Sequence, residues 1–310
     1  MRTRAKGYTR LQGGQKPARR LLRYTPATMN VMTIRSRFFL LALSLAGMLA
    51  SGWATANDIA REVRAGRDQA ASYDGGFLEL GLVVEVFSNP LMGLSEEDNG
   101  VDIGIALNGE YQWRGLFVEA NTESERGLVL GYNLARGERW LLDIIGSNQH
   151  DEISEDMDDR LEGLRDRELD FMLGLRSTHY FGSNIFQLEW MRDISDRHEG
   201  VAVNASLGKF WQVRNWNVHA ILTYRHKSAR VMEYYVGVRE DEVTDRFSAY
   251  SPGAGHISGL EVGITLPLSE KWILRSTAQY FALSDAMSES PLATEDAGGR
   301  LLTSVTRVFN

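Results

Sequence analysis

Hydrophobic and polar residues alternate along much of the chain after residue 75. In segment 259–266, one face of an extended strand would carry Leu260, Val262, Ile264 and Leu266, and the other face would carry Gly, Glu and Thr residues. Because successive side chains of a strand point to opposite sides, this period of two predicts β-strands. The same alternation recurs in segments 78–86, 201–208, 215–225 and 272–280.

Two features favour a membrane barrel over the alternative, a soluble β-sandwich. Aromatic residues bracket an aliphatic stretch in two strands, from Trp216 to Tyr224 and from Trp272 to Tyr280. At about 3.3 Å per residue and a tilt near 40°, each interval covers roughly 20 Å of the membrane normal, close to the apolar band of outer-membrane barrels. The opposite faces carry Arg, Glu, Asn and Gly, with Ile221 as an apolar exception, and such faces suit a hydrated or hydrogen-bonded lumen.

The predicted fold is therefore all-β, an antiparallel transmembrane β-barrel of twelve strands, with ten or fourteen as alternatives. We expect strands at 76–87, 101–108, 113–121, 127–133, 139–147, 168–179, 184–193, 199–210, 214–226, 257–267, 271–282 and 299–309. The predicted inner turns are short: Gly109–Gln112, Leu134–Glu138, Tyr180–Ser183, Trp211–Val213 and Leu268–Glu270. The predicted outer loops are 88–100, 122–126, 148–167, 194–198, 227–256 and 283–298. The strand-like run Val231–Val238 is assigned to an outer loop, because a thirteenth span would break the even parity of bacterial barrels.

A different pattern precedes the strands. Basic residues in segment 33–37 are followed by the apolar run Phe38–Ala50 and by the small residues Ala54 and Ala56. This order predicts a cleaved secretory signal peptide, since the run is too short to cross a bilayer as a helix. We therefore expect an N-terminal extension and signal peptide at 1–56 (with Met29 or Met32 as the true start), a short periplasmic segment at 57–75, and the barrel at 76–310.

Composition removes several functional classes. The chain has no Cys, which excludes disulfides, thiolate metal sites and cysteine nucleophiles. Residues 1–56 contain ten Lys and Arg residues and no acid, so residues 57–310 carry 24 basic and 41 acidic residues, a net charge of −17. A body this acidic repels phosphate backbones, and we expect no nucleic-acid partner.

Carboxylates gather in the predicted outer loop 148–167. Ca²⁺ and Mg²⁺ prefer such ligands, but the spacing lacks the Gly and terminal Glu of an EF-hand loop. A solvated charged loop is the favoured interpretation, and the acidic segment 96–100 is interpreted in the same way. We therefore predict no metal-binding and no cofactor-binding residues. The carboxylates concerned are Asp151, Glu152, Glu155, Asp156, Asp158 and Asp159.

The histidines provide the only test of an enzymatic function. His219 is predicted to point inward at mid-strand, where a hydrogen bond in the lumen would satisfy it. His256 and Ser258 share a strand face, but neither Gly-x-Ser-x-Gly nor His-Glu-x-x-His occurs in the chain. We predict no catalytic residues and no enzymatic activity, and an outer-membrane hydrolase is the least favoured alternative. Loops or strand ends hold the remaining histidines, which are expected to be solvated: His150, His179, His198, His226 and His256.

The second half of the chain resembles the MipA/OmpV family of outer-membrane proteins. The resemblance rests on Tyr234-Tyr235-Val236-Gly237-Val238, Tyr250-Ser251-Pro252-Gly253-Ala254-Gly255, Pro267-Leu268-Ser269-Glu270-Lys271-Trp272, Ser284-Asp285-Ala286 and Ser290-Pro291-Leu292. It implies a β-barrel in the outer membrane of a Gram-negative bacterium, in contact with lipid or lipopolysaccharide. It further implies a scaffold that links a periplasmic murein transglycosylase to a murein synthase. Other members of the family are described as porin-like or adhesive, so a diffusion channel and a surface adhesin are the alternatives.

Two further features lie near the ends of the mature chain. Family members tend to finish on an aromatic residue, whereas Phe309 is here the penultimate residue, and an outward Arg307 would have to reach the membrane interface. Near the other end, Arg61, Arg64 and Arg67 are three residues apart. They would share one side of a helix that could dock a periplasmic enzyme, although Gly66 makes a frayed terminus the favoured interpretation.

Overall fold

The computed structural model describes residues 63, 74–94, 97–123, 127–150, 152–154 and 158–309. The predicted signal peptide, its cleavage point and the three arginines of the predicted docking helix lie outside these residues.

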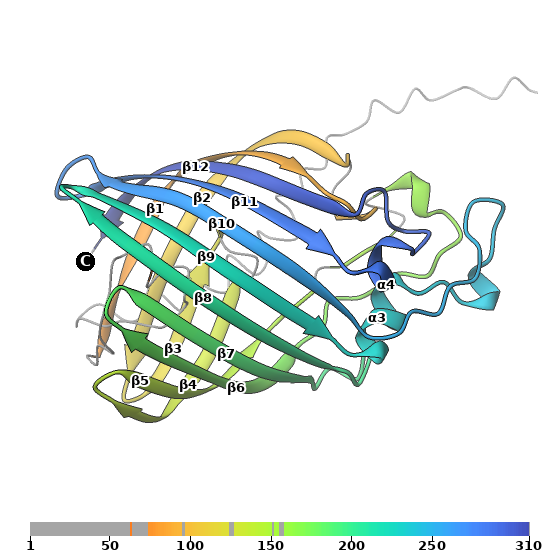
Figure 1. The fold of residues 1–310 in the computed structure, drawn as a ribbon, viewed down its shortest axis with the longest axis horizontal. Coiled ribbons are helices and arrows are strands. Elements are labelled where there is room, and N and C mark those ends of the chain that lie inside the picture. The colour runs from red at the N-terminus through yellow and green to blue at the C-terminus, as the bar shows by residue number, and fades with distance from the viewer. Residues whose placement is uncertain are drawn as a thin grey trace, which may run out of the picture. The chain divides into compact units, whose positions relative to one another are not determined.

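Twelve antiparallel strands form a closed barrel, as the alternation predicts (Figure 1). Each strand pairs with its neighbours in the sequence, and the last strand closes the ring on the first, with Leu78 opposite Phe309. The strands are β1 (Gly75–Ser88), β2 (Asn99–Trp113), β3 (Leu116–Asn121), β4 (Leu128–Gly137), β5 (Trp140–Ser147), β6 (Met172–Phe181), β7 (Asn184–Asp193), β8 (Val201–Val213), β9 (Trp216–Lys227), β10 (Gly255–Pro267), β11 (Trp272–Leu283) and β12 (Ala297–Phe309).

The outer surface is apolar and the interior is polar. In β9 the outward Leu222 and Tyr224 expose 56% and 45% of their surface, whereas the inward Asn217 and His219 are buried. The aromatic pairs that bracket β9 and β11 all face outward, which confirms the predicted orientation of both strands. This is the inverse of a soluble sandwich, whose core side would be the apolar one.

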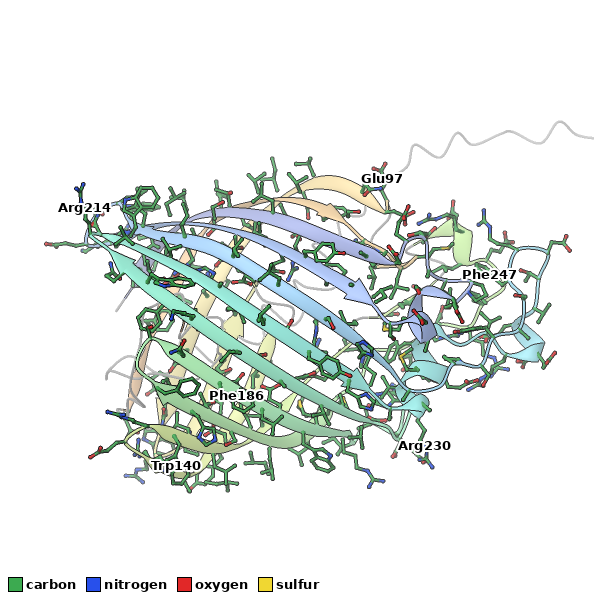
Figure 2. All side chains as sticks on the ribbon, viewed as in Figure 1. Glu97, Trp140, Phe186, Arg214, Arg230 and Phe247 are labelled. Atoms are coloured by element: carbon green, nitrogen blue, oxygen red, sulfur yellow. The ribbon has the colours of Figure 1, made fainter. Side chains whose placement is uncertain are left out.

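The barrel has two different ends. All five short turns lie at one end, with Gly75 and Phe309, and we call it the turn end. The six longer connections lie at the opposite end, the loop end. Figure 2 shows Arg214 at the turn end and Phe247 at the loop end.

Four of the five short turns begin further along the chain than predicted. Asn108 and Gly109 look like turn residues, but Gly109 lies inside β2, opposite Leu78. The strand continues with Glu110 inward and ends at Trp113, and the turn falls at Arg114 and Gly115, which both have positive φ angles (50° and 87°). The prediction of a turn at Gly109–Gln112 was therefore wrong, and so was that at Trp211–Val213, since β8 includes these residues. β4 likewise continues to Gly137 and β6 to Phe181, so only the last residues of the turns predicted at Leu134–Glu138 and Tyr180–Ser183 lie outside strands.

The run Val231–Val238 lies in the predicted outer loop but is not a strand. It contains the helix α3 (Ala229–Val236), and two 3-10 turns and a second short helix also occur at the loop end: η1 (Asp159–Leu161), η2 (Glu240–Glu242) and α4 (Asp285–Ser288). The buried residues of α3 are Val231, Met232, Tyr235 and Val236, a helical spacing that packing against neighbouring loops selects over the strand propensity of Val and Tyr. No helix in the described part of the chain is both long and apolar enough to cross a bilayer.

One residue from before the barrel reaches its interior. Val63 is fully buried in an apolar cluster with Leu141, Tyr180, Ile185, Phe210 and Ile221. Ile221, the exception to the alternation in β9, is thus an inward side chain with an apolar neighbour. Most of these residues belong to the turn-end halves of β5 to β9, so the cluster lies toward that end of the lumen.

Candidate functional site

A buried ionic network lies on the inner wall of the barrel, along strands β3 to β6. The guanidinium of Arg176 on β6 donates to both carboxylate oxygens of Glu119 on β3, at 3.1 and 2.7 Å, and to Asp143 on β5 at 3.3 Å. The side chain of Asn133 donates to Asp143 at 2.6 Å and thereby joins β4 to the network. The ring of Phe117 lies 5.2 Å from the Arg176 guanidinium carbon. Removing one buried charge would leave its partner in a low-dielectric site, so these groups stabilise the barrel only as a set.

Two further networks line other parts of the wall. Arg275 on β11 donates to both oxygens of Glu79 at 2.8 and 2.6 Å and lies 3.5 Å from Glu123, which also accepts a short hydrogen bond from Ser304. Elsewhere Glu261 on β10 contacts His219 Nε2 at 2.9 Å. This confirms the hydrogen bond predicted for that histidine. The polar interior is therefore cross-linked between strands by charged groups.

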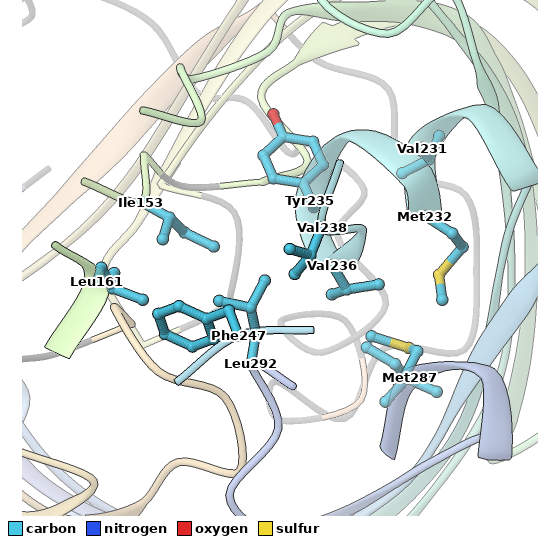
Figure 3. Packing of buried hydrophobic residues seen from close by; sticks show 11 residues of the cluster. Ile153, Leu161, Val231, Met232, Tyr235, Val236, Val238, Phe247, Met287 and Leu292 are labelled. Atoms are coloured by element: carbon cyan, nitrogen blue, oxygen red, sulfur yellow. The ribbon is translucent and has the colours of Figure 1, made fainter. Parts of the chain in front are cut away.

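The loops at the opposite end converge on one apolar cluster, which we call the cap (Figure 3). Around the ring of strands, the connection between β5 and β6 lies opposite the connection between β11 and β12. The cap nevertheless joins both, because Ile153 and Leu161 come from the first region and Leu292 from the second. It therefore extends across the mouth of the barrel. Its remaining buried members are Val231, Met232, Tyr235, Val236, Val238, Phe247, Ile257 and Met287.

Ion pairs hold the cap together at its edges. Arg160 donates to Asp158 beside it and to both oxygens of Asp98 in the β1–β2 loop, at 2.6 Å each. Arg167 and Glu242 form a buried pair at 2.8 Å that ties the β5–β6 loop to the β9–β10 loop. Burial alone would raise the pKa of Glu242, but the hydrogen bonds from Arg167 and from backbone N–H groups lower it below its usual range.

The acidic loop is thus partly structural, which corrects the prediction that its carboxylates are solvated. Asp158 is 5% exposed and accepts hydrogen bonds from the backbone of Gly93 and from Arg160. Asp98, predicted to be solvated as well, forms the other half of the Arg160 pair. Asp151, Glu155 and Asp156 lie outside the described residues.

A second correction concerns two histidines predicted to be solvated. His150 and His198 are both buried, and both contact the carboxylate of Asp170, His150 through Nδ1 at 2.6 Å and His198 through Nε2 at 3.1 Å. The other oxygen of Asp170 accepts the backbone N–H groups of Gln149 and His150. The His150 ring stacks on Tyr235 of α3 at 4.2 Å. The cluster therefore connects three loops beneath the cap.

The three side chains lie close enough together to bind a transition metal. Their hydrogen bonds favour a different interpretation, because Gly200 donates its backbone N–H to His198 Nδ1 at 2.9 Å. That contact places the imidazole proton on Nε2, from which it is donated to Asp170. A metal at Nε2 would displace this proton and leave two N–H groups facing each other at Nδ1. The cluster is thus best explained as a hydrogen-bonded structural link.

The charge states of His150 and Asp170 agree with a structural role for the cluster. Burial and, next, the positive charge of Lys227 lower the pKa of His150 to about 4, so the ring is neutral near pH 7. Burial alone would raise the pKa of Asp170, but the hydrogen bonds from the two histidines hold it well below its usual range.

An Asp–His pair also makes up two of the three members of a catalytic triad, but the third, a nucleophile, is missing beside His150 among the described residues. His150 Nε2 is buried and forms no hydrogen bond with any of them. A serine hydrolase would place a hydroxyl at that atom. Of the other histidines, His179 is exposed as predicted, and His256 stacks on Tyr224 at 5.0 Å. Sequence reasoning missed the cluster, although His150, Asp170 and His198 all fall near strand ends on the loop side.

Comparison with known sequences identifies the family. The family described as MltA-interacting protein MipA matches residues 80–309, which is nearly all of the barrel. The chain belongs to this family. The match includes the Arg176 network, the cap and the histidine cluster.

The named relatives share low sequence identity with this chain. The MltA-interacting protein of Escherichia coli (strain K12) is 25% identical over 157 residues, 49% of this chain and 62% of the relative. The outer membrane protein OmpV of Vibrio cholerae serotype O1 is 20% identical over 159 residues, 50% of this chain and 60% of the relative. The matched region thus spans less than two thirds of either relative.

Solved structures show a weaker likeness. OprD from Pseudomonas aeruginosa has a TM-score of 0.33 at 10% identity, covering 78% of this chain and 67% of that one. An outer membrane channel from Pseudomonas putida F1 has a TM-score of 0.38 at 10% identity, covering 79% and 98%. Structural similarity this low supports no conclusion about mechanism or about transported solutes.

Family and fold together establish the location. The protein is an outer-membrane β-barrel of a Gram-negative bacterium, as the sequence predicts. Bacterial barrels place their short turns in the periplasm and their long loops outside the cell. The turn end is therefore periplasmic, and the cap and the histidine cluster are extracellular.

Proposed function

We propose that the protein is a closed, non-catalytic barrel that serves as an outer-membrane scaffold for periplasmic murein enzymes. A lytic transglycosylase is the first partner, as the name of the Escherichia coli relative indicates for that protein. A murein synthase is the second, as the family resemblance implies. The periplasmic turns supply the docking surface, since only they face the compartment in which these enzymes act.

The observation that carries this proposal over a channel is the cap. Its side chains come from loops on opposite sides of the ring, and the Arg160–Asp98 and Arg167–Glu242 pairs fasten those loops together. Below it, Arg176, Glu119 and Asp143 lie in the lumen. A barrel obstructed in this way is suited to presenting its rim to partners rather than to passing solutes.

Affinity capture tests the scaffold directly. The mature, tagged protein in mild detergent should retain purified transglycosylase MltA, and a murein synthase should then join the complex. The matched control is a variant in which three turns are replaced by Gly-Ser linkers of equal length, and it should lose the enzymes while the barrel stays folded. If neither enzyme is retained by the unmodified protein, the scaffold function is wrong.

A diffusion channel is the second candidate, favoured by the polar, charged lumen wall. Planar-bilayer recordings separate the two functions. A scaffold closed by its cap should give no conductance steps, whereas a channel should give stable, repeated ones. The double variant Arg167→Ala/Phe247→Ala, which removes a cap ion pair and a cap side chain, should admit current only if the cap is the barrier.

A further inference from the structure

The basic residues of the barrel differ in how they are neutralised. In the lumen and at the loop end, most described arginines have a carboxylate partner; examples are Arg176 with Glu119 and Arg230 with Glu199. At the periplasmic end, the turns and outward strand faces of the described chain carry seven basic residues and three acidic ones, Asp74, Glu138 and Glu270. None of the seven has an Asp or Glu oxygen within 4.0 Å of its charged nitrogens in the described part of the chain. These residues, which we call the basic rim, are Arg114, Arg136, Arg139, Lys209, Arg214, Lys271 and Arg307.

Three members of the basic rim lie against aromatic rings. Arg114 lies over Trp113 at 5.0 Å, Lys209 over Trp211 at 5.5 Å and Arg307 over Phe309 at 5.0 Å. All three rings are substantially exposed on the outside of the barrel: Trp113 by 50%, Trp211 by 44% and Phe309 by 42%. Such rings form the aromatic belt of a membrane protein at the level of the lipid headgroups.

Lys209 and Arg307 are the most informative, because they lie within strands and not in turns. Each shares the outward face of its strand with the aromatic residue two positions closer to the end. A cation at such a position is costly in hydrocarbon, and its long side chain must carry the charge to the interface. With no carboxylate of the described chain beside it, the charge there is open to an anion from outside the protein.

Five of the seven members of the basic rim follow one another around the barrel. Lys271 lies beside Arg307, because its carbonyl accepts the N–H of Val308 at 2.8 Å. The β8–β9 turn that holds Arg214 contacts the β10–β11 turn through the Asn215 side chain and the Pro267 carbonyl at 3.4 Å. The sector from β8 through β12 to β3 thus presents Lys209, Arg214, Lys271, Arg307 and Arg114 in succession.

We propose that this sector of the basic rim binds the headgroup phosphates of anionic phospholipids in the periplasmic leaflet. Arg114, Lys209 and Arg307 provide the cations, and their aromatic neighbours hold them at headgroup depth. Charge complementarity selects the occupant, since a phosphate is the anion that lies at this depth along the whole circumference of an embedded barrel. The inference goes beyond the scaffold function and does not depend on it.

Native mass spectrometry of the mature protein in detergent tests the proposal. Dioleoyl phosphatidylglycerol and dioleoyl phosphatidylcholine are titrated separately, and the lipids retained per barrel are counted. Each basic residue near the headgroups strengthens binding to anionic lipid by about fivefold, so the unmodified protein should prefer phosphatidylglycerol by at least about tenfold. The preference should decline between 50 and 500 mM salt.

The variant Arg114→Gln/Lys209→Gln/Arg307→Gln should bind the two lipids about equally. Its matched control, Arg165→Gln/Arg192→Gln/Arg230→Gln, loses the same charge from the loop end and should keep the preference. If the triple variant does not fold, Lys209→Gln and Arg307→Gln are measured singly.

Equal retention of the two lipids by the unmodified protein overturns the proposal, and so does an equal loss in the control. A third outcome also overturns it: the triple variant loses captured murein enzymes but keeps its lipid preference. In that case the basic rim would be a protein-docking surface. Loss of the lipid preference with enzyme capture unchanged supports the lipid site and leaves the scaffold function intact.

Discussion

Arg176 and Glu119 lie face to face in the lumen, with two parallel hydrogen bonds at 3.1 and 2.7 Å between the guanidinium and the carboxylate. Both side chains are almost fully buried, and they come from strands that are not neighbours in the barrel. A two-pronged pair of this kind fixes both distance and orientation. It therefore links β3 to β6 over the inner faces of the two strands between them.

Replacing Arg176 with Met should destabilise the barrel by about 3–5 kcal/mol, because Glu119 and Asp143 would remain buried without its charge. Urea unfolding in detergent micelles, followed by tryptophan fluorescence, measures the change. The double variant Arg176→Met/Glu119→Gln should recover part of the loss. Arg192→Gln, on the outer face of β7, is the control and should change stability by less than about 0.5 kcal/mol. A loss for Arg176→Met no larger than that of the control would exclude a structural role.

The number and order of strands followed from sequence because a barrel wall obeys one simple rule. Outward residues meet lipid and inward residues meet polar groups. The period of two therefore continues past the turn-like Gly109, with Glu110 inward and Trp113 outward. The position of a turn is less predictable, since Gly109 is equally compatible with a strand. Arg114 adopts a positive φ angle that its residue type rarely takes, and no local pattern indicates this.

The loop end was predicted less well, because long-range contacts determine its structure. Nothing in the alternation places His150 beside Asp170 and His198, which are brought together by loops that fold over one another. The same packing makes α3 a helix, although its Val and Tyr residues favour a strand. The available indication was positional: charged and imidazole groups near strand ends on one side of a barrel are candidates for mutual contact.

Phe247 is the cap residue whose removal should be most informative. It is 1% exposed and lies within the apolar cluster, so Phe247→Ala should cost about 3–5 kcal/mol of local packing. We expect proteinase K to cleave the loops of this variant at least tenfold faster, while the urea midpoint of the barrel stays the same. Val243→Ala, at a site that is 48% exposed in the same loop, should not change the cleavage rate. Equal rates for the two variants would show that the cap does not depend on this cluster.

The cap should weaken in acid, and His150 sets the pH range. The pKa of His150 is about 4 in the folded cap but close to 6.5 once the loops open. The open form therefore binds the proton first, and the stabilisation present above pH 6.5 is lost as the pH falls toward 4. Asp170, with its lowered pKa, adds a loss only below its ordinary pKa of 3.8. At pH 5 the stabilisation lost through protonation of His150 is on the order of 2 kcal/mol.

Loop cleavage by proteinase K at pH 7.5 and 5.0 measures this effect. Dividing the rate of the unmodified protein by that of His150→Gln at each pH cancels the protease's own pH dependence, since Gln does not titrate. The ratio should rise roughly tenfold or more between pH 7.5 and 5.0. A ratio that does not change with pH would mean that His150 does not control the opening.

Val63 provides a test of how the lumen is filled near its periplasmic end. Because the chain has no Cys, Val63→Cys introduces a single thiol, and its site is fully buried against Ile221 and other inward residues. A membrane-impermeant maleimide should modify it roughly 100-fold more slowly than Ser269→Cys, which lies in an exposed turn at the same end. Mass spectrometry of the labelled protein gives both rates, and Val63→Cys should match Ser269→Cys once the barrel is unfolded in urea. Similar rates for the two thiols in the folded barrel would place residue 63 outside the lumen. Ile221 would then face an open, hydrated space, in which an apolar side chain on the inner wall has no stabilising role.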